Sequence, residues 1–336
     1  MSVLRAAEEA ANQGAEMSNA LGFKNRLIHL LTGSVLGLAI SFNCCAEIDR
    51  ATLARLSMSL VKVQVSTSQG GIAIGTGVVV AQGKVITNCH VTKDAERIQL
   101  VQEGVQWEVT AMAADMHHDL CLLTVSRLNL PAITLGSVNK LSVGDPVVAA
   151  GFAFGGKAHF SQGQVHGLYA FDRSRVVRTS AQFAPGDSGG ALIDRDGNLV
   201  GINSFFAGGA SSFFAVPVDW FVDRIANIQA YQPIAPIADM PFWFRPTLAE
   251  LPMFLQAANF ETRSEWHNLL TLSENWLRNE PNHPEAWIAR GNALKQIGDS
   301  DGAKQALARA STIYAILEQT AAQRIAAPNA LTASAK

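Results

Sequence analysis

Charged residues are scarce in this sequence, and neither sign prevails. Of its 336 residues, 26 are Lys or Arg and 28 are Asp or Glu, and the formal net charge is −2. A protein that attracts nucleic acid through its electrostatic field needs a basic excess, so we expect no nucleic-acid partner. Hydrophobic residues make up 48% of the chain, which excludes a wholly disordered protein. The length favours two domains over one.

The N-terminal region lacks an apolar run long enough to cross a membrane. The stretch Leu27–Phe42 is interrupted by His29 and falls short of the about 20 residues that a spanning helix needs. It follows Lys24 and Arg26, as the core of a signal peptide follows positive charge. We therefore predict a lead-in and signal peptide over residues 1–46 and a periplasmic or secreted protein. The alternative is an uncleaved membrane anchor, with the rest of the protein outside the cytoplasm.

Only four cysteines are present, and no CxxC motif or His/Cys cluster accompanies them. We therefore expect neither a metal nor a cofactor, and we interpret His117 and His118 as surface or structural residues. Signal cleavage would leave Cys89 and Cys121. Export would permit a disulfide between them, but the sequence does not give the Cα separation that a disulfide requires. We favour two buried thiols.

The stretch PGDSGG, Pro185–Gly190, combines three glycines with a serine. Glycine permits backbone conformations that other residues resist, so successive N–H groups of such a loop can point into one cavity. A serine among them then lies beside donors that can hold a negative oxygen, as acyl transfer requires. The loop therefore makes Ser188 a candidate nucleophile.

A histidine and an aspartate stand upstream of this loop. His90 lies in TNCHV, after the apolar run that ends at Ile86, and Asp119 lies in HHDLCLLTV, which leads into another apolar run. A histidine can take the proton of a serine hydroxyl, and an aspartate can hold the imidazole in the required tautomer. The order along the chain predicts a catalytic triad of His90, Asp119 and Ser188.

With these motifs the chain resembles the trypsin-like (chymotrypsin-fold) serine proteases, and most closely the bacterial HtrA/Deg branch. TNCHV is similar to that branch's TN-x-HV, HHDLCLLTV to its DLALLKV, and PGDSGGALI to its PGNSGGAL. The resemblance covers roughly residues 56–227. It implies a serine endopeptidase that acts on protein or peptide substrates, with an oxyanion hole formed by the N–H groups of Gly186 and Ser188.

Residues 60–218 read as many short strands separated by turn residues, without a long helical period. Such a pattern favours a sandwich or a barrel. The resemblance narrows this to two six-stranded β-barrels with the triad between them, in a protease domain over residues 47–230. We predict strands at residues 60–65, 72–80, 84–87, 97–102, 107–113, 120–125, 146–150, 164–171, 176–183, 191–194, 199–205 and 212–218.

The C-terminal third changes to a helical period. Prolines are dense over residues 231–247, which indicates an extended linker. Over residues 248–320, small and large residues such as Trp287, Gly291 and Leu307 fall at the spacing of tetratricopeptide (TPR) repeats. We expect an all-α TPR-like domain where HtrA proteins usually carry a PDZ domain, followed by a disordered tail over residues 321–336. The repeats either dock a protein partner or only stabilise the protease.

The expected substrate pocket carries no carboxylate. We predict that it is lined by apolar or neutral residues, so cleavage after Lys or Arg is not expected. The phenylalanine nearest the nucleophile loop would narrow the pocket and favour small or medium aliphatic residues. The predicted lining residues are Gln182, Phe183, Phe213, Phe214 and Ala215.

Asp187 departs from the HtrA motif, where asparagine is usual. In animal trypsin-like enzymes this aspartate pairs with a new N-terminus made by zymogen cleavage, and we find no matching activation site in this sequence. The partner of Asp187 therefore stays open, and so do two functions. The favoured one is an exported serine endopeptidase with a role in envelope protein quality control. The alternative is a catalytically latent protease-fold protein that acts as an adaptor through its TPR region.

Overall fold

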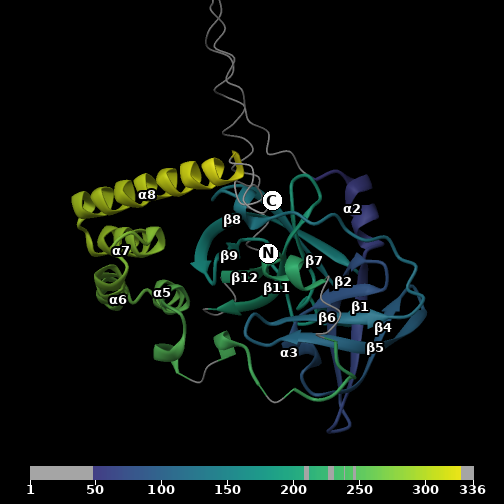
Figure 1. Cartoon of the computed structure of the whole chain (residues 1–336). Helices are drawn as coiled ribbons and strands as arrows, with labels where there is room; N and C mark the ends of the chain where they lie inside the picture. Colours follow the sequence, from purple (N-terminus) through teal and green to yellow (C-terminus); the bar gives the residue numbers. More distant parts are fainter. Residues whose placement is uncertain (1–47, 208–211, 226–230, 238, 245–246, 327–336) are drawn as a thin grey trace, which may run out of the picture. The chain divides into compact units, whose positions relative to one another are not determined.

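The computed structural model describes residues 48–207, 212–225, 231–237, 239–244 and 247–326. The predicted signal segment and the end of the predicted tail lie outside these ranges. Within the described ranges, no helix is both long enough and apolar enough to cross a membrane. Two closed β-barrels are followed along the chain by a group of helices (Figure 1).

Six antiparallel strands close the first barrel in the order β1-β2-β3-β6-β5-β4. Its interior is filled by branched side chains such as Val63, Val85 and Ile98. Branched side chains suit a pleated, half-buried surface, which explains why these runs form strands. The strands are β1 (Leu60–Thr67), β2 (Ile72–Ala81), β3 (Lys84–Thr87), β4 (Ala95–Gln102), β5 (Val105–Asp115) and β6 (Leu120–Val125).

The second barrel repeats this architecture with the strand order β10-β11-β12-β9-β8-β7. Its core contains Val147, Val177 and Leu192, again from alternate positions of neighbouring strands. The prediction of two six-stranded barrels is therefore confirmed. The strands are β7 (Pro146–Gly151), β8 (His159–Phe171), β9 (Ser174–Thr179), β10 (Ala191–Asp194), β11 (Leu199–Ala207) and β12 (Ser212–Pro217).

Several elements differ from the prediction, among them two strands and one helix. β8 begins at His159 rather than at residue 164, because its first residues pair with β7 although they show no apolar alternation. β9 ends at Thr179 rather than at residue 183. The helix α2 (Arg50–Ser57) was not predicted, and its N-terminus is capped by Asp49, whose side chain accepts a hydrogen bond from the N–H of Thr52 (2.9 Å).

The C-terminal helices pack in sequence order, each against the next. At the crossing of α7 and α8, Gly291 lies so close to Leu307 that an added Cβ would stand 2.7 Å from the Leu307 Cγ. A larger residue at position 291 would require the Leu307 side chain to move. The helices are α5 (Met253–Thr262), α6 (Trp266–Asn279), α7 (Pro284–Ile297) and α8 (Ser300–Ala326), and the short α4 (Asp219–Ile225) precedes them.

These helices contact the second barrel through both apolar and charged side chains. Phe254 of α5 stacks on Tyr169 of β8, with ring centroids 4.9 Å apart. Glu261 of α5 forms an ion pair with Arg178 of β9 (2.7 Å). The hydroxyl of Tyr314 donates to the carbonyl oxygen of Leu168 (3.3 Å). The buried core of the helices is therefore continuous with that of the barrel.

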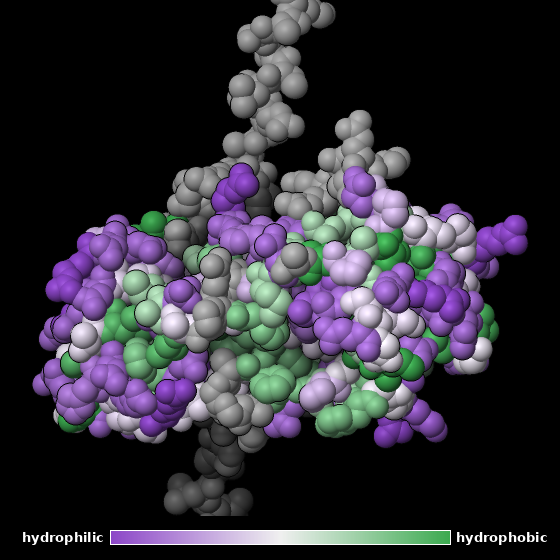
Figure 2. Space-filling model, turned by 90° about the horizontal axis from the view of Figure 1, so that it is seen from below, coloured by the Kyte–Doolittle hydropathy of each residue, from purple (hydrophilic) through white to green (hydrophobic). Residues whose placement is uncertain are grey.

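Apolar side chains also reach the surface. Figure 2 shows one face on which hydrophobic residues gather in the middle of the view, whereas hydrophilic residues predominate at its left margin. Among the described residues, Phe154 and Ile72 are the most exposed of the large hydrophobic side chains, at 80% and 66%. Gathered apolar surface of this kind is typical of regions that bind other molecules.

Glu285 makes the contact between helices and barrel sensitive to pH. The pKa of Glu285 is raised to about 8, mainly by burial and also by the charge of Glu261, against the opposing effects of Arg175 and Arg178. The folded protein therefore holds a proton that the unfolded chain releases near pH 4.5, so stability falls as pH rises through this window.

We expect the free energy of unfolding to fall between pH 5 and 8 by on the order of 3 kcal/mol more in the wild type than in Glu285→Gln, which mimics the protonated acid. Denaturant unfolding across this range measures the difference. Glu250→Gln, on an exposed residue, is the matched control. Parallel curves for the wild type and Glu285→Gln would contradict the prediction.

Candidate active site

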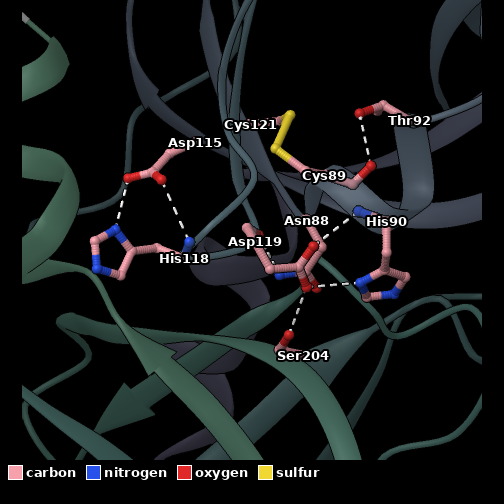
Figure 3. Close-up of a disulfide and its surroundings, with 9 residues drawn as sticks. All are labelled: Asn88, Cys89, His90, Thr92, Asp115, His118, Asp119, Cys121 and Ser204. Carbon is pink, nitrogen blue, oxygen red and sulfur yellow. Dashed lines mark hydrogen bonds and ion pairs between the residues drawn. A yellow bond between two sulfur atoms is a disulfide. The ribbon is translucent and has the colours of Figure 1, made fainter. Parts of the chain in front are cut away.

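His90 and Asp119 are brought together by the pairing of β3 with β6. Thr87 at the end of β3 lies opposite Cys121, so the short helix α3 (Cys89–Thr92) places His90 beside the turn that carries Asp119. The Nδ1 of His90 lies 2.6 Å from the Oδ2 of Asp119, and the backbone N–H of His90 donates to Oδ1 (2.8 Å). Figure 3 shows the carboxylate facing the imidazole.

A second side chain holds this carboxylate from the other barrel. The hydroxyl of Ser204, in β11, donates to the Oδ2 of Asp119 (2.7 Å) (Figure 3). Asp119 is fully buried, and a buried carboxylate needs such donors to stay ionised. Sequence reasoning missed Ser204, because a serine inside a strand carries no signal of its own.

The loop that carries Ser188 belongs to the second barrel but is held by the first. The hydroxyl of Thr76 donates to the carbonyl oxygen of Gly186 (2.7 Å), and its N–H donates to the carbonyl oxygen of Ser188 (2.8 Å). The Ser188 hydroxyl itself is directed at the carbonyl oxygen of Ser204, at 3.5 Å, rather than at His90. Among the hydrogen bonds of the described residues, none joins Ser188 to His90.

Both predicted oxyanion donors are available. In the part of the chain that the structure describes, neither the N–H of Gly186 nor that of Ser188 donates to a protein acceptor. Gly186 has a φ of 101°, a conformation that favours glycine, and a Cβ there would lie 2.5 Å from the carbonyl oxygen of Phe152. The two N–H groups can therefore hold an oxygen that becomes negative.

Asp187 finds a partner that the sequence did not reveal. Its carboxylate is buried, accepts a hydrogen bond from the N–H of Ala184 (2.8 Å), and lies 3.4 Å from the Nδ1 of His159. Burial raises the pKa of Asp187, and the Ala184 N–H and the His159 charge oppose that rise. The imidazole of His159 is thus the ion-pair partner of Asp187 that the sequence left open.

The predicted pocket residues divide between two faces of β12. Phe213 and Ala215 point into the core of the second barrel, where Phe213 packs against Phe183 with ring centroids 5.1 Å apart. Phe214 points the opposite way, as alternation along a strand requires, and it stacks on Phe205 (5.0 Å). Phe213 and Phe214 therefore lie on opposite faces of β12, and the lining of the substrate pocket stays a prediction. Gln182 is exposed.

The segment predicted as a linker lies against the first barrel and then reaches His90. Gln232 exchanges two backbone hydrogen bonds of 2.9 Å with Met112 of β5, and Ile237 packs on the first core. In the short helix Phe242–Phe244, the ring of Trp243 stacks on Phe205, 4.7 Å away. The ring of Phe244 lies 5.5 Å from that of His90. We call residues 231–244 the strap.

Cys89 and Cys121 form a disulfide, so the expectation of two buried thiols is wrong (Figure 3). Their Cα atoms lie 4.9 Å apart, within the range that a disulfide requires. This separation follows from the pairing of β3 with β6, which brings Thr87 opposite Cys121. The sequence showed both strands but not their register, and the register decides the distance.

Comparisons with known proteins agree with this geometry. Residues 75–202 match the model of the trypsin-like peptidase domain. A probable periplasmic serine endoprotease DegP-like from Chlamydia muridarum is 32% identical over 154 residues, covering 43% of this chain and 31% of the relative. Its counterpart in Pseudomonas putida strain W619 is 33% identical over 161 residues, covering 45% and 34%. The chain thus spans about a third of the length of these relatives.

A solved structure is similar as well. The active form of the Rv3671c protease from M. tuberculosis superposes with a TM-score of 0.52 at 25% identity, covering 57% of this chain and 92% of that protein. The family-model match over residues 75–202 includes His90, Asp119 and Ser188. This chain therefore contains a trypsin-like serine peptidase domain related to the HtrA/DegP serine endoproteases.

Proposed function

We propose that this protein is an exported serine endopeptidase that hydrolyses peptide bonds in proteins through His90, Asp119 and Ser188. The observation that supports this most is the hydrogen bond from the His90 Nδ1 to a buried carboxylate that Ser204 also holds. With its proton on Nδ1, the imidazole has a free Nε2 lone pair, which is the form that a general base needs.

The reaction follows from these positions. The Ser188 hydroxyl turns from the Ser204 carbonyl to the His90 Nε2, gives up its proton, and its Oγ bonds to the substrate carbonyl carbon. The N–H groups of Gly186 and Ser188 hold the resulting oxyanion, and loss of one such donor typically costs about 3 kcal/mol. His90 then protonates the leaving amine as the C–N bond breaks, and a water repeats the sequence on the acyl-enzyme.

The proposed compartment is the periplasm. The Chlamydia and Pseudomonas relatives are named periplasmic serine endoproteases, the disulfide suits an oxidising compartment, and the sequence predicts a signal peptide over residues 1–46. A protease in that compartment would meet unfolded envelope proteins, so we propose quality control as its role.

Labelling with a fluorophosphonate probe tests this proposal. The probe bonds to an activated serine and releases fluoride, so we expect labelling of the protein beginning at Glu47, with none in Ser188→Ala and a loss of at least about 100-fold in His90→Ala. Labelling should also fall in acid, because a protonated imidazole cannot accept a proton. A folded protein that stays unlabelled would instead support the latent adaptor.

Phe244 of the strap shapes the space beside His90. The side chain of His90 is only 18% exposed, and the ring of Phe244 lies 5.5 Å from its ring, so we propose that Phe244 limits the size of the substrate side chain next to the scissile bond. We expect Phe244→Ala to raise kcat/KM about tenfold for peptides with a large residue next to the scissile bond, relative to peptides with alanine there. A peptide library read by mass spectrometry measures this ratio. The exposed Phe206→Ala is the control, and an unchanged ratio would remove Phe244 from the substrate site.

We further propose that helices α5–α8 form a TPR-like unit that docks partners or substrates. The close contact of Gly291 with Leu307 is what such repeats need at a helix crossing. A cleft of about 620 Å³ lies where α7 and α8 meet the second barrel, with Arg175, Glu285 and Ser311 among its lining residues. Its size and mixed polarity suit a peptide segment.

A variant that fills this cleft distinguishes docking of a protein substrate from mere stabilisation of the protease domain by the helices. Ser311→Trp would occupy the cleft, whereas Thr312→Trp would add the same side chain on the neighbouring exposed position, which does not line it. We expect Ser311→Trp alone to lower kcat/KM for an unfolded protein substrate by about tenfold, while turnover of a short peptide stays unchanged. Equal kcat/KM values of the two variants for the unfolded protein substrate would contradict the docking role.

A further inference from the structure

Two turns that lie far apart in the sequence bring three metal-binding side chains together. His117 and His118 stand in the turn between β5 and β6, and Asp172 stands in the turn between β8 and β9. The Nε2 of His117 lies 2.7 Å from the Oδ2 of Asp172, and the Nε2 of His118 lies 3.2 Å from the same oxygen. One ligand atom from each residue falls within 4.8 Å of the others.

The carboxylate of Asp115 orients His118 by contacting its other ring nitrogen. Its Nδ1 lies 2.7 Å from the Oδ2 of Asp115, and Figure 3 shows the ring turned toward Asp115. Both side chains are largely buried, at 14% and 10% exposure. A carboxylate on one ring nitrogen fixes the tautomer and leaves the other nitrogen as a metal ligand, an arrangement typical of histidines that bind zinc.

Trp220 contacts both turns that carry these side chains. Its ring stacks on His118 with centroids 4.1 Å apart, and its Nε1–H donates to the backbone carbonyl oxygen of Asp172 (3.0 Å). The same side chain thus holds a ligand from each turn. The rings of His117 and His118 stand edge to face, 4.8 Å apart, so their nitrogens approach Asp172 from different directions.

We propose that His117, His118 and Asp172 form a binding site for a divalent transition metal of the zinc class, with a fourth position open to water. Two imidazole nitrogens and one carboxylate oxygen are a donor set that Zn²⁺ accepts. Tetrahedral Zn²⁺ with bonds near 2.1 Å holds its ligand atoms about 3.4 Å apart, so the observed separations of 2.7 and 3.2 Å need only a small expansion. The metal replaces any proton held between each imidazole and the carboxylate, and these protons pass to solvent.

A metal ion bound at this site would cross-link the two barrels. One turn precedes Asp119 directly, and the other belongs to the second barrel, so a bound ion would tie the aspartate of the proposed triad to β8 and β9. The sequence offered no sign of the site, because the carboxylate lies more than 50 residues from the histidines (54 from His118). The expectation of no metal site rested on the absence of a local cluster.

Titration calorimetry with ZnCl₂ on chelator-treated protein carrying Ser188→Ala, which prevents self-cleavage, tests the proposal. We expect one ion to bind per chain and to raise the melting temperature. Asp172→Asn should weaken binding by about 100-fold or more, and Asp115→Asn by about 10- to 100-fold. Asp172 has a φ of 42°, which asparagine tolerates, so the turn should survive the change, and the melting temperature without metal checks this.

Two controls locate the ion. His267→Ala removes an exposed histidine of α6, and His90→Ala removes the imidazole of the proposed triad, and both should leave the affinity within about twofold of the parent. Absence of stoichiometric binding in the parent protein would overturn the proposal. So would full binding by Asp172→Asn, or loss of binding in His90→Ala, which would place the ion at the triad instead. None of these readouts depends on peptidase activity.

Discussion

Asparagine at position 119 is expected to lower kcat/KM by about 10⁴-fold while the fold survives. The Oδ1 and Oδ2 atoms of Asp119 accept from the backbone N–H and the Nδ1 of His90. In Asp119→Asn, the amide oxygen can still accept from the backbone N–H of His90, but the NH₂ group then faces Nδ1. Because this group donates, Nδ1 must accept, and the imidazole proton moves to Nε2. The nitrogen that faces Ser188 then carries a proton and cannot accept another.

Steady-state hydrolysis of a peptide substrate measures this loss, and circular dichroism with thermal unfolding checks the fold. The Ser204 hydroxyl can turn to accept from the new amide, so the burial of position 119 does not by itself predict unfolding. Asp196→Asn, at an exposed hairpin tip, is the matched control. An Asp119→Asn protein with more than a tenth of the parent's activity would show that another group orients His90.

Removing the disulfide is expected to have the largest effect on stability. Cys89 and Cys121 lie 32 residues apart in the sequence, and closure of a loop of this length stabilises a folded protein by about 3–4 kcal/mol. For a domain of this size, we expect Cys89→Ala with Cys121→Ala to lower the melting temperature by about 10 °C.

Wild-type protein refolded in the presence of reductant should melt near the temperature of the double variant, which separates the lost cross-link from the lost sulfur atoms. Added reductant should not shift the double variant further. Both sulfurs are buried, so reductant added to the folded protein should act slowly. If the double variant had the same melting temperature as the oxidised wild type, the closed loop would contribute nothing to stability.

Many strands of both barrels could be predicted because short alternating or continuous apolar runs lie between turn residues. Leu60–Val65 largely alternates apolar and polar residues, whereas Leu120–Val125 is an almost continuous apolar run. Alternation fails where both faces of a strand are covered or both are exposed, as in the first residues of β8. The same rule, applied within β12, would have placed Phe213 and Phe214 on opposite faces.

The three residues of the proposed triad stand in local motifs that the sequence displays, but the contacts around these residues were not predictable. Ser204 reaches Asp119, and His159 reaches Asp187, only because strands distant in the sequence lie side by side. The disulfide depends on the register of β3 and β6. Such contacts are set by tertiary packing, which a single sequence does not display residue by residue.

The strap and the helices are joined to the second barrel by a continuous row of aromatic rings. Trp243 stacks on Phe205, Phe205 on Phe214, and Phe214 meets Phe254 of α5 with ring centroids 6.3 Å apart. Packed interiors do not deform continuously, so α5 cannot shift without moving the residue that follows Ser204. The C-terminal helices are therefore not an exchangeable module. A chimera joined within the strap would cut through a shared interior, and grafting these helices onto another peptidase would require the ring row to be transplanted with them.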